Sequence, residues 1–285
     1  MTAHLEIDLL RTFAVIAETR ALSRAAPRVG RTQAAISMQV KRLEQIVGQP
    51  LLNRTGRGVI LTTQGERLLV HAHRILRYHD EAMAELSGKG LSGTIRFGCP
   101  DDYAAVFLPH LLRGFARRHP QVMVEVFCAS TPRLLERLKT HALDLALTSF
   151  PEDEKGEAII RREPLVWVGS IGSNAVSQKP LQLALGDRDA IDHQTARKSL
   201  ERAGIAYRVA FASGSVAGLT AVVRSGQAIA VLTQTAVPSD LHILPLDSGL
   251  PSLPRVSIAL KFESDQPAAL VSAFADHVRL VLPTI

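Results

Sequence analysis

The sequence contains little cysteine and has no long apolar stretch. Cys99 and Cys128 are the two cysteines among 285 residues, too few for a disulfide framework. No run of about 18 uncharged apolar residues appears, so no membrane span is expected. Residues 1–8 lack a cationic segment followed by an apolar one, so we expect no signal peptide. These absences predict a chain that works in the reducing cytoplasm.

Patterns typical of catalytic, cofactor and metal sites are missing as well. The chain lacks a nucleophile elbow, a P-loop and the glycine fingerprint of dinucleotide-binding folds. Its ten histidines show no metal-ligand spacing. His71, His73 and His79 share one predicted helix, but no Cys/His pair completes a zinc motif. We therefore expect no enzyme activity, no cofactor and no metal site.

Positive charge is concentrated near the N-terminus. Residues 20–62 contain eight lysines and arginines and one acidic residue, Glu44, so their net charge is 8 − 1 = +7, whereas the whole chain carries +6. Residues 91–285 carry 20 basic and 19 acidic residues, a net of +1. This distribution predicts a polyanionic partner for the N-terminal end and leaves the remainder near neutral.

The cationic segment has the pattern of a helix-turn-helix. Apolar spacing predicts helices at residues 7–18, 23–29 and 32–47. Ser23 and Thr32 are the expected N-caps, and Gly48 is expected to end the third helix. On that helix one stripe is apolar and faces inward, and the opposite stripe is polar and cationic. This division suits a helix that lies in a major groove.

A hairpin and a long helix are predicted next. Residues 50–62 alternate around Gly56-Arg57-Gly58, which indicates a two-stranded wing. A helix over residues 63–87 begins with a capping box formed by Thr63 and Glu66. Its apolar positions, with one histidine among them, have heptad spacing: Leu68, Ala72, Ile75, His79, Ala82 and Leu86. This seam predicts a linker helix that joins two subunits, followed by a flexible hinge at residues 88–93.

Beyond the hinge, strands and helices alternate. The first five elements have the order βαβαβ, which predicts a parallel sheet. A second set begins near residue 165. Two α/β units in series predict two lobes with a cleft between them. We assign residues 94–163 and 263–285 to lobe I and residues 164–262 to lobe II.

Taken in order, these motifs resemble the LysR-type transcriptional regulators. The N-terminal segments that match are Leu22-Ser-Arg-Ala-Ala26, Thr32-Gln-Ala-Ala-Ile-Ser37, Leu43-Glu44, Leu51-Leu-Asn-Arg-Thr-Gly-Arg-Gly58 and Leu61-Thr-Thr-Gln-Gly65. Weaker matches follow at Leu108-Pro-His-Leu-Leu112, His119-Pro120 and Leu143-Asp-Leu-Ala-Leu147. The resemblance implies an α/β chain with an N-terminal winged helix-turn-helix, a long dimerising linker helix and a two-lobed effector domain similar to periplasmic binding proteins. It also implies homodimers that pair into homotetramers on promoter DNA, and we expect RNA polymerase as a further partner.

Eight residues are expected to contact DNA. They are Arg31, Thr32, Gln33, Ser37, Lys41, Arg42, Arg54 and Arg57. Gln33, at the start of the third helix, suits a bidentate contact to adenine, and Thr32 suits a phosphate at the helix N-terminus. Arg57, at the tip of the wing, suits a narrow minor groove. Each residue alone could be a solvated surface charge or a helix cap, but the ordered set favours DNA.

An effector site is expected beyond the carboxyl ends of the strands. The candidates follow three strands of lobe I and lie in one loop of lobe II: Pro100, Asp101, Asp102, Tyr103, Ser130, Thr131, Thr148, Ser149, Ser213 and Ser215. Hydroxyl groups at helix starts suit an anion, whereas Asp101 and Asp102 favour a cationic or polyhydroxyl ligand. Helix capping is an equally good interpretation of each residue.

The sequence therefore predicts a DNA-binding transcriptional regulator modulated by an unidentified small molecule. One alternative is a regulator without an effector, controlled by protein level or oligomerisation. A second is an α/β enzyme with a DNA-binding head, which no catalytic constellation supports. Cys99 and Cys128 end neighbouring strands, so a redox switch is an alternative to buried small apolar side chains, the interpretation we favour.

Overall fold

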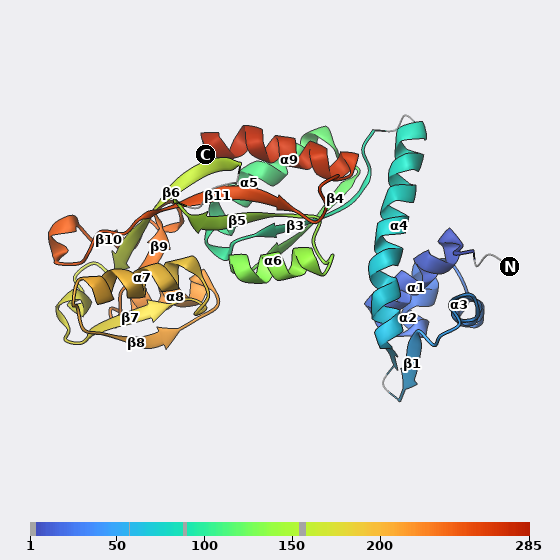
Figure 1. Cartoon of the computed structure of the whole chain (residues 1–285), viewed down its shortest axis with the longest axis horizontal. Coiled ribbons are helices and arrows are strands. Elements are labelled where there is room, and N and C mark those ends of the chain that lie inside the picture. The colour runs from blue at the N-terminus through green and yellow to red at the C-terminus, as the bar shows by residue number, and fades with distance from the viewer. Residues whose placement is uncertain (1–3, 57, 88–89, 154–157) are drawn as a thin grey trace. The chain divides into compact units, whose positions relative to one another are not determined.

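The chain folds into two compact units. The computed structural model describes residues 4–56, 58–87, 90–153 and 158–285. One unit ends at Gly93, and the other runs from Thr94 to Ile285. In Figure 1 the first unit is a group of helices with a small hairpin, and the second is built of α/β layers. In the described part of the chain, no helix combines the length and apolar character that crossing a membrane requires.

The N-terminal unit has the predicted helix-turn-helix and wing. Its elements are α1 (Ile7–Thr19), α2 (Leu22–Arg28), α3 (Gln33–Val47), β1 (Leu52–Thr55), β2 (Gly58–Leu61) and α4 (Thr63–Ser87). The two strands pair in antiparallel register, from Leu52 opposite Leu61 to Thr55 opposite Gly58.

The predicted limits of α3 are confirmed. Thr32 Oγ accepts a hydrogen bond from the Ala35 N–H at 3.2 Å, which satisfies one of the unpaired donors of the first turn. Gly48 follows the last residue with a left-handed φ of 73°, a conformation that glycine adopts without steric cost.

Two other predicted caps are wrong by one or two positions. α2 is preceded by Ala21, so Ser23 lies inside the helix. At α4 the Gly65 N–H donates to Thr62 Oγ at 3.0 Å, so Thr62 caps this helix and Thr63 is its first residue. Thr62 has this role because its own N–H donates to the Leu51 carbonyl, which holds it at the end of the wing.

One hydrophobic core joins α1, α3 and the start of α4. Its buried side chains are Leu9, Leu10, Phe13, Leu43, Leu51, Ala72 and Leu76, with Leu68 and Ile75 packed against them. Ala72, one position of the predicted seam, is fully buried here and so packs inside the subunit. The pairing of two subunits through the seam stays a prediction. Leu86, near the other end of α4, is 84% exposed.

The C-terminal unit is built on one seven-stranded sheet. Its order is β10-β6-β11-β5-β3-β4, and β9 also pairs with β6. The strands are β3 (Gly93–Cys99), β4 (Val122–Cys128), β5 (Leu145–Pro151), β6 (Ile159–Gly169), β9 (Ala230–Thr233), β10 (His242–Ile243) and β11 (Arg255–Phe262). A parallel pair, β7 (Leu181–Leu185) and β8 (Tyr207–Ala212), is linked to this sheet by a bridge between Leu183 and Ile229.

One long strand, β6, runs through both lobes. β3 and β5 are parallel, as predicted for lobe I. β11, which we assigned to lobe II, pairs with β5 from Val256 opposite Pro151 to Phe262 opposite Leu145. Its place is therefore in the sheet of lobe I. β6 pairs with β11 through its first half and with β9 and β10 through its second half, so hydrogen-bonded strands connect the lobes.

Helices cover the two parts of this sheet (Figure 1). Lobe I carries α5 (Asp101–Arg118), α6 (Thr131–Lys139) and α9 (Ala269–Val281), and lobe II carries α7 (Ile191–Arg202) and α8 (Val216–Arg224). Short 3-10 turns lie at Ala175–Ser177, Gln234–Ala236, Leu246–Ser248 and Leu282–Thr284. In lobe I the Phe274 ring makes edge contacts with Phe97 and Phe115, at centroid distances of 5.1 and 4.8 Å. In lobe II the core includes Trp167, the single tryptophan of the chain.

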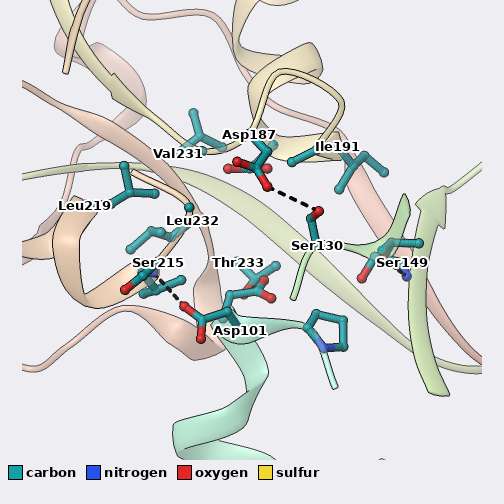
Figure 2. Close-up of a pocket in the computed structure, with 18 of the residues that line it drawn as sticks. Asp101, Ser130, Ser149, Asp187, Ile191, Ser215, Leu219, Val231, Leu232 and Thr233 are labelled. Carbon is teal, nitrogen blue, oxygen red and sulfur yellow. Dashed lines mark hydrogen bonds between the residues drawn. The ribbon is translucent and has the colours of Figure 1, made fainter. Parts of the chain in front are cut away.

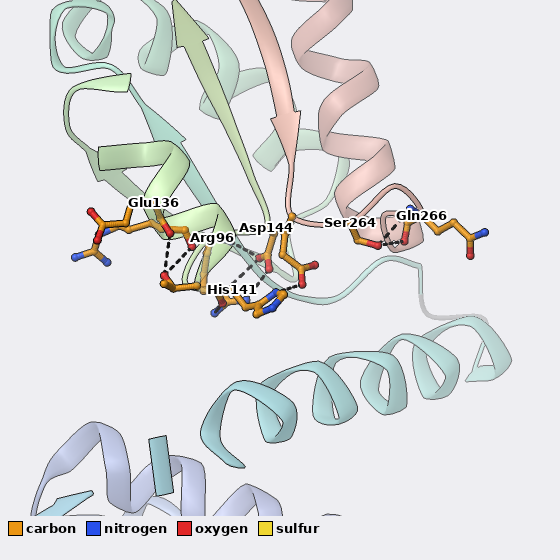
Figure 3. Close-up of polar contacts among 9 residues, drawn as sticks. Arg96, Glu136, His141, Asp144, Ser264 and Gln266 are labelled. Atoms are coloured by element: carbon orange, nitrogen blue, oxygen red, sulfur yellow. Dashed lines mark hydrogen bonds and ion pairs between the residues drawn. The ribbon is translucent and has the colours of Figure 1, made fainter. Parts of the chain in front are cut away.

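A polar network lies where β5 begins (Figure 3). The Arg96 guanidinium donates to Asp144 Oδ1 at 2.7 Å, and the Arg96 backbone N–H donates to Oδ2 at 2.7 Å. The same guanidinium reaches the His141 carbonyl at 2.9 Å, and the His141 ring contacts the buried Glu263 carboxyl. Because the Asp144 side chain is 2% exposed, this pair is held by several hydrogen bonds rather than by a surface charge contact.

Candidate nucleic-acid interface and ligand cleft

The third helix separates a buried stripe from an exposed one, as predicted. Ile36, Val40 and Leu43 are buried. Ile36 and Val40 pack α3 against α2 and the wing, and Leu43 packs in the core shared with α1 and α4. The predicted DNA contacts at the start of the helix, Arg31, Thr32 and Gln33, are exposed, and so are Lys41 and Arg42 further along. The exposed face of α3 is therefore polar and cationic, as expected of a helix that lies in a major groove.

Two of the predicted DNA contacts are joined to each other. The Arg54 guanidinium, on the wing, donates to Ser37 Oγ, on α3, at 2.6 Å. This bond holds the wing against α3 and leaves the hydroxyl hydrogen of Ser37 able to donate. Arg42 forms an exposed ion pair with Glu6. Surface pairs of this kind contribute little to stability, so the pair can exchange for a phosphate. Arg57 lies outside the described residues.

Glycine is required where the wing meets α1. Gly58 has a φ of 137°, and a Cβ at this position would lie 2.4 Å from the Arg20 carbonyl oxygen. The same carbonyl accepts the Val59 N–H at 2.9 Å. The glycine-flanked tip seen in the sequence thus permits the close backbone contact that places the wing.

A cavity that is open to solvent lies between the two lobes (Figure 2). Nine of the ten predicted effector residues line it: Pro100, Asp101, Asp102, Tyr103, Ser130, Thr131, Ser149, Ser213 and Ser215. Thr148 does not, because neighbouring side chains of a strand point to opposite faces. Thr148 is fully buried, and its hydroxyl donates to the Ala259 carbonyl at 3.2 Å.

Most of the lobe II wall was missed from the sequence. The missed residues are Leu165, Gly186, Asp187, Ala190, Ile191, Asp192, Gly214, Val216, Leu219, Val231, Leu232 and Thr233. Gly186 and Asp187 directly follow β7, so the strand-end rule used for lobe I could have found them. The apolar members carry no such signal, since they resemble any other core residue.

Direct contacts bridge the lobes across this cavity. Asp101 Oδ2, from lobe I, accepts the Val216 N–H at the start of α8 in lobe II at 2.7 Å. Thr233 Oγ donates to Asp102 Oδ2 at 3.1 Å. Ser130 Oγ lies 3.5 Å from Asp187 Oδ2, the limit for a hydrogen bond. The positive end of α8, which suits an anion, is thus occupied by a carboxylate of the protein.

The hydroxyl residues of the cleft have structural roles as well. Ser215 caps α8 by accepting the Gly218 N–H at 3.4 Å. Thr131 Oγ accepts the Ser149 N–H at 3.0 Å, and the Tyr103 hydroxyl lies 3.1 Å from Ser149 Oγ. Helix capping and cavity lining are therefore compatible at Ser215.

Acidic residues outnumber basic ones in the lining of the cleft, although one of them, Asp187, is paired with Arg133 at 3.3 Å. Among the described residues that line the cleft, four are aspartates and none is a lysine, arginine or histidine. Burial, and next the negative charge of Asp192, raise the pKa of Asp102 to about 7, although the Thr233 hydroxyl acts in the opposite direction. Burial also raises the pKa of Asp192. Burial thus disfavours the ionised forms of both carboxyl groups. A cation bound in the cavity would favour those ionised forms by its opposite charge.

The two cysteines are free, and they differ in exposure. Cys99 is buried, as predicted. Cys128 is exposed, so the prediction that it is a buried small apolar side chain is wrong. Burial raises the pKa of both thiols. The thiolate that redox exchange needs is therefore disfavoured at each position.

Comparisons with known proteins identify the same family in both units of the chain. The family model "Bacterial regulatory helix-turn-helix protein, lysR family" matches residues 7–66, and the model "LysR substrate binding domain" matches residues 88–282. The HTH-type transcriptional regulator DgdR of Burkholderia cepacia is 64% identical over 281 residues, which cover 99% of this chain and 96% of DgdR. PecT of Dickeya dadantii is 30% identical, with 95% and 85% covered. The structure of full-length CbnR complexed with its target DNA has a TM-score of 0.65 at 21% identity, with 97% and 100% covered, and is thus similar in fold.

Proposed function

The chain belongs to the LysR family of DNA-binding transcriptional regulators, and we propose that a small molecule bound between its lobes controls the way it binds promoter DNA. Its named relatives regulate transcription and are not enzymes. The observation that carries the proposal is the cavity lined by residues of both lobes. A ligand there would change contacts that now join the lobes directly.

We infer that α3 enters a major groove while the wing lies beside it. In this arrangement Gln33 contacts a base edge, and Thr32, Lys41 and Arg42 contact phosphates. Arg54 contacts an adjacent phosphate, and Arg57 suits the minor groove. One such unit reads few base pairs, so two units of a dimer would read a roughly two-fold symmetric operator. Pairing of dimers into a tetramer and contact with RNA polymerase are further parts of this proposal.

We propose that the effector carries an ammonium or similar cationic group and a short apolar portion. Asp102 and Asp192 offer negative charge without a basic side chain among the described lining residues. Leu165, Leu219 and Val231 offer an apolar wall. A carboxylate group would meet repulsion from the aspartates and would have to compete with Asp101 for the start of α8. Charge complementarity therefore favours a cation.

Control of DNA binding would follow from a change in the lobe contacts. A ligand that separates the lobes breaks the hydrogen bond between Asp101 and Val216, and a ligand that draws them together strengthens it. Either effect shifts the population between two arrangements of the effector unit. The shift can be no larger than the difference in affinity of the ligand for the two arrangements.

Butylamine, butanol and butyrate provide a test, because they share a carbon chain and differ in head group. Thermal unfolding of the full-length protein is followed by Trp167 fluorescence at equal probe concentration and ionic strength. We expect butylamine to raise the Tm most, since a ligand stabilises the state that binds it. A larger rise with butyrate would contradict the cationic effector. A footprint on promoter DNA that saturating amine leaves unchanged would contradict the control of DNA binding.

The interlobe hydrogen bonds also favour a second candidate, a regulator without an effector. The carboxylate of Asp101 already satisfies the start of α8, so the lobes can be held together by the protein alone. In that case none of the three probes would change the Tm. The operator footprint would then depend on protein concentration only.

A further inference from the structure

Met38 stands out on the DNA-facing side of α3. It is 69% exposed, although it lies in a helix whose outer stripe is otherwise polar or small. The residues one turn before and nearly one turn after it, Ala34 and Lys41, are exposed on the same face. Ile36 and Val40 occupy the opposite, buried stripe. A lone exposed apolar side chain is ordinary on a protein surface, so its place on the recognition helix is what gives it meaning.

The major groove offers one apolar group to such a side chain. The C5 methyl of thymine projects into the groove, whereas the other base edges present hydrogen-bond donors and acceptors. Methionine is long, unbranched and polarizable, so it can adapt to a methyl group without exact alignment. It cannot pair with a phosphate, and its thioether is only a weak acceptor. Its chemistry therefore differs from that of the neighbouring predicted contacts, Gln33 and Ser37.

We propose that Met38 determines specificity by contacting the C5 methyl of a thymine in each half-site, with Ala34 completing the apolar surface. Contact with the methyl removes apolar area of both partners from water. The free energy of burying one such group corresponds to about a fourfold change in Kd. The inference depends on DNA binding by α3 and is independent of any ligand in the cleft.

The test replaces thymine by deoxyuridine, which lacks only the methyl group. A duplex is selected from random DNA with the full-length wild-type protein, and its thymines are replaced one at a time. Kd is measured by fluorescence anisotropy at constant salt. For the wild type, we expect one replacement in each half-site to weaken binding about fourfold. For Met38→Ala the same replacement should have no effect, whereas Met38→Leu should keep part of the discrimination.

Met83→Ala is the matched control, because Met83 is also exposed, at 56%, but lies on α4. It should keep the wild-type ratio between the thymine and deoxyuridine duplexes. Within one variant, the ratio cancels effects of the substitution on folding, dimerisation or phosphate contacts. Comparing the ratios of two variants cancels effects of deoxyuridine on DNA shape. The proposal is overturned if no wild-type position responds to the methyl group, or if Met38→Ala responds as strongly as the wild type. A selected half-site without thymine would overturn it equally.

Discussion

Asp102→Asn should stabilise the effector unit at neutral and higher pH. The side chain lines the cleft without a positive partner among the described lining residues, and burial is the main reason that its pKa lies at about 7 instead of the ordinary 3.8. Asparagine has the same shape, and its oxygen can still accept the hydrogen bond from Thr233. The substitution therefore removes a costly charge and keeps the contact.

The sign of the pH dependence follows from proton binding. Below the ordinary pKa, the folded and unfolded chains both hold the proton. Between that pKa and about 7 the unfolded chain releases it while the folded chain keeps it, so stability falls as pH rises. Above about pH 7 the folded chain has released the proton too, so stability does not fall further. The full difference corresponds to about 4 kcal/mol, and water in the open cavity reduces it. We expect the advantage of Asp102→Asn to grow by about 1–3 kcal/mol between about pH 5 and pH 8.

Asp101→Asn is a control of opposite sign one residue away. The carboxylate of Asp101 accepts the Val216 N–H at the positive end of α8. Loss of its charge should therefore destabilise the unit, by about 1 kcal/mol. Denaturant unfolding of the full chain is followed by Trp167, which reports on the C-terminal unit alone. Equal pH profiles for wild type and Asp102→Asn would refute the raised pKa.

Two further predictions concern packing and the buried ion pair. Gly65→Ala should destabilise the N-terminal unit by about 3 kcal/mol or more, because its Cβ would lie 2.1 Å from the Leu51 carbonyl oxygen. Faster amide hydrogen exchange in α1 would show this loss of stability. Gly56→Ala, where the Cβ meets open space, is the control and should leave the exchange rate unchanged. Asp144→Asn should destabilise the C-terminal unit by about 3 kcal/mol, because Arg96 would lose the carboxylate that its guanidinium and N–H both contact. If denaturant unfolding of this variant matches the wild type, the network contributes little to stability.

The N-terminal unit could be predicted closely from the sequence, because its signals are local. Thr32 and Gly48 mark the ends of α3 through backbone geometry that lies within a few residues. The seam on α4 shows the limit of such patterns. Heptad spacing tells that Ala72 faces something apolar, but it does not tell whether the surface belongs to α1 or to a second subunit.

The C-terminal unit depends more on contacts between distant residues. The position of β11 in the sheet of lobe I is set by pairing with β5, about 110 residues earlier. Thr148 and Ser149 were both expected in the cleft, and the alternation along β5 sends only Ser149 there. Asp192 and the apolar lobe II wall could not be found from strand ends alone, because they lie within helices and strands and the apolar ones resemble other core residues.

The most direct test of the central claim, that α3 reads bases while flanking cations hold phosphates, is a salt titration with specific and substituted duplexes. Full-length wild type should bind the selected duplex with a steep dependence on salt. Gln33→Ala should keep that slope and lose about 1–3 kcal/mol of discrimination at one base pair. Discrimination that is unchanged at every base pair, or binding that is insensitive to salt, would contradict the account.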